Sequence, residues 1–195
     1  ARIVNEKRVM QGAVLIDGEK IAKIFQEKER TGNYDKEIDA KGQYLLPGVI
    51  DDQVHFRQPG MTHKADIYSE SRAAAAGGVT SYMEMPNTHP ATINMERIHE
   101  KQEIAAADSL VNYAFYMGAT PDNLSEIEQA DPETVAGLKV FMGSSTGNLL
   151  VNKAADLERI FKASHLRILT HSESDELIAA NLNRLKNTYG DDIPI

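Results

Sequence analysis

Residues 44–57 decide the fold, and they read Tyr44-Leu45-Leu46-Pro47-Gly48-Val49-Ile50-Asp51-Asp52-Gln53-Val54-His55-Phe56-Arg57, an apolar strand that ends on polar side chains. Because side chains alternate along a strand, Gln53, His55 and Arg57 can project together into one cavity. They would place a potential metal ligand beside a forked donor that suits an anion. This combination indicates hydrolytic chemistry.

Two later apolar strands also carry polar groups. Lys139 lies inside the run 137–141, and His171 directly follows the run 166–170. In a barrel, the carboxyl ends of the parallel strands meet at one mouth. We therefore expect His55, Lys139 and His171 to converge there.

The chain changes character around residue 47. Residues 1–46 contain short strands separated by turns, and we expect a small β-sandwich-like domain there. Residues 47–195 alternate apolar strands with helix-compatible segments, which is the pattern of parallel βαβ units. The predicted strands are 1–4, 13–16, 21–24, 44–46, 49–53, 80–85, 111–116, 138–142 and 166–170. The predicted helices are 69–76, a segment capped by Asn94 that runs to residue 107, 156–163 and 175–188.

Two α/β architectures contain such units. An open, doubly wound sheet would carry a glycine-rich phosphate loop after its first strand, and this sequence lacks one there. A (β/α)8 TIM-type barrel fits better, although such barrels have about 250 residues. About five of the eight units would be present, and a barrel cut there would expose two edge strands. We therefore expect the chain to be part of a longer polypeptide.

Composition narrows the classes of partner. The 195 residues carry a formal charge of −8 and no cysteine. The acidic balance argues against nucleic acid and favours a small-molecule partner. No apolar stretch approaches the roughly 20 residues that cross a bilayer, so we expect no membrane partner. Without cysteine, a metal must be held mainly by histidine or carboxylate, and we expect a cytoplasmic protein.

His55 and His171 are the strongest candidates for metal ligands. A lone histidine is more often an ordinary core or surface residue, but a catalytic metal needs imidazoles delivered from different strands, as here. The other histidines fall in loops or helices, where we expect them to be solvated: His63, His89, His99 and His165.

Lys139 is a cation within an apolar strand. Such a lysine can snorkel to the rim or pair with a buried carboxylate. Alternatively, burial lowers its pKa and frees a neutral amine that can add carbon dioxide. The N-carboxylated lysine would then be an anionic bidentate group that bridges two divalent metals in place of an aspartate or glutamate.

Arg57 and Asn87 are candidates for substrate binding. Arg57 offers a forked donor for a carboxylate, although an exposed salt bridge is its ordinary explanation. Asn87 lies just beyond a predicted strand end, where it is either a ligand contact or a turn residue beside proline. The loop 143–148 lacks the ending of a phosphate-binding loop and is expected to be flexible.

Three motifs together identify a resemblance. Residues 46–60, residues 73–80 and the run Met85-Pro86-Asn87-Thr88 resemble the dihydroorotases of the amidohydrolase superfamily. Residues 139–148 and the strand end at His171 follow in the family's order, so the resemblance covers nearly the whole chain and about the first half of a full-length enzyme. It implies a metal-dependent homo-oligomeric enzyme that interconverts dihydroorotate and N-carbamoyl-aspartate in pyrimidine biosynthesis.

The resemblance also implies roles for particular residues. His55 and His171 match metal-binding positions, and Lys139 matches the carboxylated lysine of the members that have one. Arg57 and Asn87 match residues that hold the substrate carboxylate. One or two zinc ions per subunit are implied. The family's proton shuttle, an aspartate on the last barrel strand, would lie beyond residue 195, as would a further metal-binding histidine.

Gln53 departs from the family pattern, because the family's His-x-His pair appears here as Gln53-x-His55. A neutral carboxamide oxygen is a weaker zinc ligand than imidazole. Three outcomes are open: weak coordination by Gln53, a single metal, or a non-catalytic homologue that binds a partner enzyme. Allantoinases and hydantoinases share the scaffold but usually differ at the Arg57 and Asn87 positions, which favours dihydroorotate as the substrate.

Overall fold

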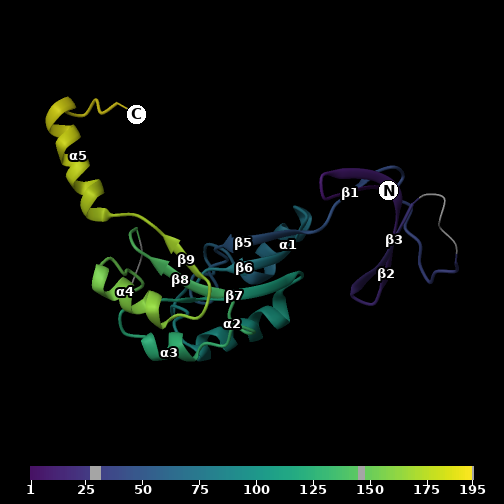
Figure 1. Ribbon diagram of the computed structural model, residues 1–195, viewed down its shortest axis with the longest axis horizontal. Helices are drawn as coiled ribbons and strands as arrows, with labels where there is room; N and C mark the ends of the chain where they lie inside the picture. The colour runs from purple at the N-terminus through teal and green to yellow at the C-terminus, as the bar shows by residue number, and fades with distance from the viewer. Residues whose placement is uncertain (27–31, 145–147, 195) are drawn as a thin grey trace. The chain divides into compact units, whose positions relative to one another are not determined.

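The structure is a computed structural model, and it describes residues 1–26, 32–144 and 148–194. The chain forms two compact units, Ala1–Gly48 and Val49–Ile195. Each unit has its own sheet (Figure 1).

The first unit is a four-stranded sheet in the order β3-β2-β1-β4. Its strands are β1 (Arg2–Asn5), β2 (Arg8–Asp17), β3 (Lys20–Gln26) and β4 (Tyr44–Leu45). Ile3 and Phe25 form its small buried centre. Gly12 allows this packing, because a Cβ atom there would lie 2.1 Å from the Phe25 carbonyl oxygen. The four predicted strands of this region are confirmed, although β2 is longer at both ends than expected.

The second unit contains a parallel sheet in the order β5-β6-β7-β8-β9. Its strands are β5 (Val49–Val54), β6 (Val79–Glu84), β7 (Asn112–Gly118), β8 (Gly137–Phe141) and β9 (Ile168–His171). Neighbours along the chain are neighbours in the sheet, which is the order of a barrel rather than of a doubly wound sheet. All five predicted strands are confirmed within two residues at each end.

Helices follow the strands. They are α1 (Ile67–Ala76), α2 (Met95–Asp108), α3 (Leu124–Gln129), α4 (Ala154–Ala163) and α5 (Asp175–Tyr189). Of these, α1, α2 and α5 begin at a side-chain cap. The predicted cap is confirmed, because the Asn94 side chain accepts a hydrogen bond from the Arg97 N–H. Helix α3 was not predicted; it has six residues and no side-chain cap, because Asn123 directs its amide to other backbone groups.

One face of the parallel sheet packs on the helices. Tyr82, Phe115, Leu138 and Val140 from the strands share one hydrophobic core with residues of α1, α2, α3 and α4. Figure 1 shows α2 and α3 running along the same side of the sheet. Helix α5 is different, because it buries no residue and leaves apolar side chains exposed.

The opposite face of the sheet carries Met83, Tyr116, Lys139, Phe141 and His171, and we call it the inner face. Paired residues of parallel strands share a face, and the register pairs Gly118 with Lys139 and Phe141 with His171. The Tyr116 hydroxyl lies 3.3 Å from the Met83 sulfur, which places β6 and β7 side chains on the same face. None of the helices in the described residues has the length and apolar character of a membrane-spanning segment.

Candidate active site

Lys139 and His171 come together on the inner face through Phe141. The Lys139 ammonium lies 5.1 Å from the centroid of the Phe141 ring, and that ring stacks on His171 at 6.3 Å. Lys139 is 3% exposed and lies within β8 rather than at its end, whereas His171 is the last residue of β9. Adjacent parallel strands therefore deliver an amine and an imidazole to one region.

His55 and Asn87 meet directly at the ends of β5 and β6. Asn87 Oδ1 lies 2.8 Å from His55 Nδ1. Because a carbonyl oxygen can only accept, Nδ1 carries the hydrogen and Nε2 keeps a free lone pair. Burial is the main cause that lowers the pKa of His55, and the charges of Arg57 and Lys139 lower it further. The lowered pKa favours the neutral ring, which is the form that metal coordination requires, although the hydrogen bond with Asn87 acts in the opposite direction.

Arg57 reaches the site by a different route from the one that strand alternation predicted. Strand β5 ends at Val54, and Arg57 has a positive φ of 67° in the following turn. A left-handed conformation at a non-glycine residue costs of order 1–3 kcal/mol and often marks a functional position. Arg57 therefore lies outside the alternating strand, although the charge of its side chain lowers the pKa of His55.

The turn that carries Arg57 packs against the loop that carries Asn87. The His89 N–H donates to the Pro59 carbonyl oxygen at 3.1 Å. A Cβ atom on Gly60 would lie 1.8 Å from the His89 carbonyl oxygen, so only glycine fits there, and its φ of 84° also favours glycine. The Gln58 side chain accepts from the Ile67 N–H at the start of α1 and fixes the turn from the other side.

Gln53 is exposed on β5. Its backbone N–H donates to Asp51 Oδ1 at 3.1 Å, and within the described residues its side chain has no hydrogen-bond partner. The contacts that join His55 to Asn87 do not include it. Its expected role as a weak metal ligand stays a prediction.

Lys139 has the environment of a reactive amine. Burial lowers its pKa. Within residues 1–26, 32–144 and 148–194, no carboxylate lies at ion-pair distance from its nitrogen. A buried amine without a carboxylate partner favours the neutral, nucleophilic form.

His171 also presents an unused nitrogen. Its Nε2 atom lies 3.1 Å from Glu173 Oε1, but the contact lacks hydrogen-bond geometry, so this buried nitrogen has no hydrogen-bond partner among the described residues. Glu173 accepts a hydrogen bond from the Ser144 hydroxyl, which is the main cause that lowers the Glu173 pKa. The sequence analysis assigned no role to Glu173 or Ser144.

These donors can hold a metal if Lys139 carries a carboxyl group. Among the described residues, no three His, Cys, Asp or Glu side chains form a metal-binding cluster by themselves. Nε2 of His55 and Nε2 of His171, which has no hydrogen bond among the described residues, would supply two imidazole ligands. A carboxylated Lys139 would add the anionic oxygen ligands that zinc accepts beside imidazole.

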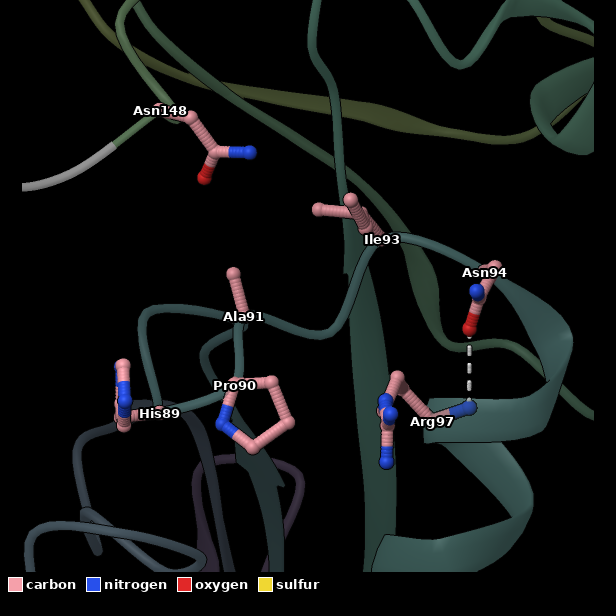
Figure 2. Close-up of a pocket in the computed structure, with 7 residues that line it drawn as sticks. All are labelled: His89, Pro90, Ala91, Ile93, Asn94, Arg97 and Asn148. Atoms are coloured by element: carbon pink, nitrogen blue, oxygen red, sulfur yellow. Dashed lines mark hydrogen bonds between the residues drawn. The ribbon is translucent and has the colours of Figure 1, made fainter.

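Two cavities border the loop after β6. The first has a volume of about 410 Å³, and Figure 2 shows its lining, with Asn148 facing Ala91 and Ile93 across the opening. The second, of about 320 Å³, is bordered by Asn87 and Gly60 and shares His89 and Asn148 with the first. Volumes of this order accommodate small molecules. Residues 145–147 of the loop predicted to be flexible lie outside the described residues.

Two buried charges outside this cluster escaped the sequence analysis. Glu84 on β6 and Lys101 on α2 are each 1% exposed and form an ion pair. A signal existed, because Lys101 stands at helical spacing from Ile98 and Ala105 on the apolar face of α2.

Comparisons with known proteins identify a matching family model and similar enzymes. A family model described as Dihydro-orotase-like matches residues 42–183. A dihydroorotase of Methanosarcina mazei is 34% identical over 90% of this chain and 39% of its own length. An allantoinase of Deinococcus radiodurans is 37% identical over 71% of this chain and 32% of its own length.

A solved structure shows the same architecture. An L-hydantoinase (dihydropyrimidinase) from Arthrobacter aurescens superposes with a TM-score of 0.86 at 28% identity, over 98% of this chain and 43% of that one. The predicted barrel architecture, with a partial barrel and an additional sheet, is confirmed. The chain spans less than half of the length of each of these three proteins.

Proposed function

This chain belongs to the dihydro-orotase-like family, as its motifs predicted, and from that membership we propose that the complete natural polypeptide interconverts dihydroorotate and N-carbamoyl-aspartate. The forward reaction is hydrolysis of a cyclic amide C–N bond. The observation that carries the proposal is the hydrogen bond between Asn87 and His55, with Arg57 close enough to act on the same imidazole. This arrangement supports a metal ligand beside two groups that recognise a carboxylate.

In this proposal, Arg57 and Asn87 bind the substrate carboxylate. The Arg57 guanidinium can form two parallel hydrogen bonds with it. Asn87 uses Oδ1 to hold His55, which leaves its amide N–H groups free to donate to the substrate. One side chain would then fix the distance between the substrate and a metal ligand, which is how positioning lowers a reaction barrier.

His55, His171 and a carboxylated Lys139 would hold one or two zinc ions, with Gln53 as a weak additional ligand. Zinc in such a site lowers the pKa of a bound water to about 7 and polarises a carbonyl group. The Lys139 amine would attack the carbon of carbon dioxide and lose a proton, which yields a carbamate anion. The aspartate expected to protonate the leaving nitrogen would lie beyond residue 195.

Turnover by the zinc-loaded complete polypeptide tests the proposal. We expect dihydroorotate to be opened faster than allantoin or hydantoin, and Lys139→Ala to remove the activity. Arg57→Met should raise the KM for dihydroorotate about 10- to 100-fold, the loss of a charge-assisted pair. A wild-type rate no higher than that of Lys139→Ala would contradict the proposal.

A second candidate is hydrolysis of another cyclic amide, as in an allantoinase or hydantoinase. The similarity to the Deinococcus radiodurans allantoinase and to the Arthrobacter aurescens L-hydantoinase favours it. It would replace the first candidate if allantoin or hydantoin were the faster substrate and Arg57→Met left that turnover unchanged. A non-catalytic protein would show no turnover, and its zinc content would be less than about a tenth of an ion per chain.

The proposed enzyme is a cytoplasmic homo-oligomer. The absence of cysteine fits a reducing compartment. Light scattering on the complete polypeptide measures the mass in solution, and a monomer at micromolar concentration would contradict the oligomer.

A further inference from the structure

The pair Glu84–Lys101 lies on the helix-facing side of β6, away from the inner face. Glu84 is paired with Phe115 of β7 in the register, and the Lys101 ammonium lies 5.1 Å from the Phe115 ring centroid. Lys101 donates to Glu84 Oε2 and also to the Met85 carbonyl oxygen at 3.1 Å. None of these contacts has a part in the proposed reaction.

An ion pair in this position contributes little net stability, because removing two charges from water offsets most of their attraction. An apolar pair of similar volume would fill the same space between β6 and α2. The second bond of Lys101, to the Met85 carbonyl, is what an apolar residue could not make. Through this bond, Lys101 holds the backbone that directly follows β6.

Met85 links the two loops of the candidate site. Its N–H donates to the Val54 carbonyl oxygen at 3.0 Å, directly before His55. Its own carbonyl belongs to the peptide bond with Pro86, whose nitrogen has no hydrogen to donate. Among the described residues, Lys101 is therefore the donor that holds this peptide plane, two residues before Asn87.

The peptide between Pro86 and Asn87 is also held by hydrogen bonds. The Pro86 carbonyl oxygen accepts from the Thr88 N–H at 2.9 Å and from the Thr92 N–H at 3.0 Å. Pro86 has a φ fixed by its ring, so a rotation of the Met85 peptide would move Pro86 and Asn87 together. Through Met85, which bonds to both Lys101 and the Val54 carbonyl oxygen, the pair is linked to the residue directly before His55.

We propose that Lys101, oriented by Glu84, is a positioning residue that sets the Asn87 amide against His55. The role in substrate binding rests on the proposed function, whereas the effect on the backbone does not. Glu84 serves to hold the ammonium in place, and the Met85 carbonyl receives the hydrogen bond that matters for Asn87.

The test replaces the pair in two ways in the complete polypeptide. The double variant Glu84→Leu with Lys101→Met removes both charges and avoids leaving one of them buried alone. The variant Glu84→Gln keeps an acceptor for Lys101 and hence its bond to Met85. A third variant, Ile98→Val, removes a methyl group from the same face of α2 without touching either contact.

Two readouts are compared, and one of them needs no activity. Hydrogen exchange at the Thr88 and Thr92 amides should accelerate about tenfold or more in the double variant and stay within about twofold in Glu84→Gln, beyond any change in global unfolding. The KM for dihydroorotate should rise about tenfold in the double variant, the equivalent of about one hydrogen bond, with a smaller change in kcat. Ile98→Val should change neither value.

Wild-type exchange and KM in a folded double variant would overturn the positioning role. Equal effects of Ile98→Val and the double variant would also overturn it, because general loosening of α2 would then explain both. If the wild-type protein does not open dihydroorotate, the proposed function fails, while exchange at Thr88 still decides the positioning role.

Discussion

Asn87 Oδ1 accepts a hydrogen bond from His55 Nδ1 at 2.8 Å, across two neighbouring strands and 32 residues of sequence. The contact selects the imidazole tautomer whose Nε2 lone pair is free. It also commits one end of the Asn87 amide, so the other end is the part available to a ligand. In the proposed site, binding of a metal and binding of a substrate would therefore be coupled through one side chain.

Replacement of Asn87 separates these two effects. Asn87→Ala should lower zinc affinity about 10- to 100-fold, as expected when the partner of a ligating histidine is lost, and should also raise the KM for the substrate. Asn87→Asp keeps an oxygen for His55 Nδ1 but loses the amide donor and adds a negative charge. We expect it to retain zinc and lose substrate affinity, measured by metal analysis and steady-state kinetics. Equal zinc loss in both variants would contradict the assigned role of Oδ1.

A carbamate on Lys139, as proposed, would be detectable without turnover. Protein prepared with zinc and ¹³C-bicarbonate should show a carbamate carbon signal by NMR, because burial lowers the pKa of Lys139 and leaves a nucleophilic amine. Lys139→Met keeps an unbranched side chain without the amine and should lack the signal and most of the zinc. The surface variant Lys162→Met is the control, since Lys162 pairs with Glu158 on the outside of α4. A signal that persists in Lys139→Met would place the modification elsewhere.

Gln53→His should raise the zinc content of the complete polypeptide from about one to about two ions per chain. Imidazole binds zinc more strongly than a carboxamide oxygen, and His55 is two residues away. Gln53→Ala should leave the content near that of the wild-type protein if Gln53 coordinates weakly. Two ions per chain in the wild-type protein, reduced to one in Gln53→Ala, would show instead that the glutamine is an effective ligand.

Much of the architecture was predictable from local patterns. The apolar runs that precede His55 and His171 in the sequence predict β5 and β9, and Asn94 predicts the start of α2. Helix α3 was not predictable in this way, because its six residues carry no cap and gain their order from packing of Ile127 in the core.

The site was predictable as a set of residues but not as a geometry. Strand alternation suggested how Arg57 approaches His55, yet the chain turns through a positive φ at Arg57, which a sequence pattern does not reveal. The pair Glu84–Lys101 depends on the packing of a helix on a strand 17 residues away. Helical spacing marks Lys101 as a residue of the buried face of α2, but the carboxylate that it meets there follows from tertiary structure.

The ion pair Glu84–Lys101 gives a prediction about stability. Lys101→Met alone should lower the free energy of unfolding by about 3–5 kcal/mol, because it leaves the Glu84 carboxylate buried without a partner. Adding Glu84→Leu should recover most of that loss, since two apolar side chains replace two charges. Urea unfolding of Lys101→Met, Glu84→Leu, the double variant and the wild-type protein gives the coupling free energy. Losses that add in the double variant would mean that the two side chains do not interact.

Tyr82 predicts how stability depends on alkaline pH. Its ring packs on Phe56 with centroids 4.4 Å apart, and its hydroxyl is buried without a hydrogen-bond partner among the described residues. Ser109 Oγ lowers the pKa of Tyr82 against the effect of burial. The Ser109 hydroxyl donates its own hydrogen to the Val111 carbonyl oxygen. Burial raises the pKa of Tyr82 to about 12.

The unfolded chain releases the same proton near pH 10. Above that pH the unfolded state binds fewer protons than the folded state, so the contribution of Tyr82 is fully present below about pH 10 and is lost as the pH rises towards 12. The loss amounts to about 3 kcal/mol at the upper end. Tyr82→Phe should be within about 1 kcal/mol of the wild-type protein at pH 8 and more stable than it at pH 11.5.

Urea unfolding at the two pH values measures this difference, with Tyr189→Phe on the exposed face of α5 as the control. The Tyr189→Phe control should lose the same amount of stability as the wild-type protein between pH 8 and pH 11.5, because the side chain that it changes is exposed in the folded protein. If Tyr82→Phe loses as much stability as the wild-type protein over this range, then the Tyr82 hydroxyl is not held in its neutral form by the core.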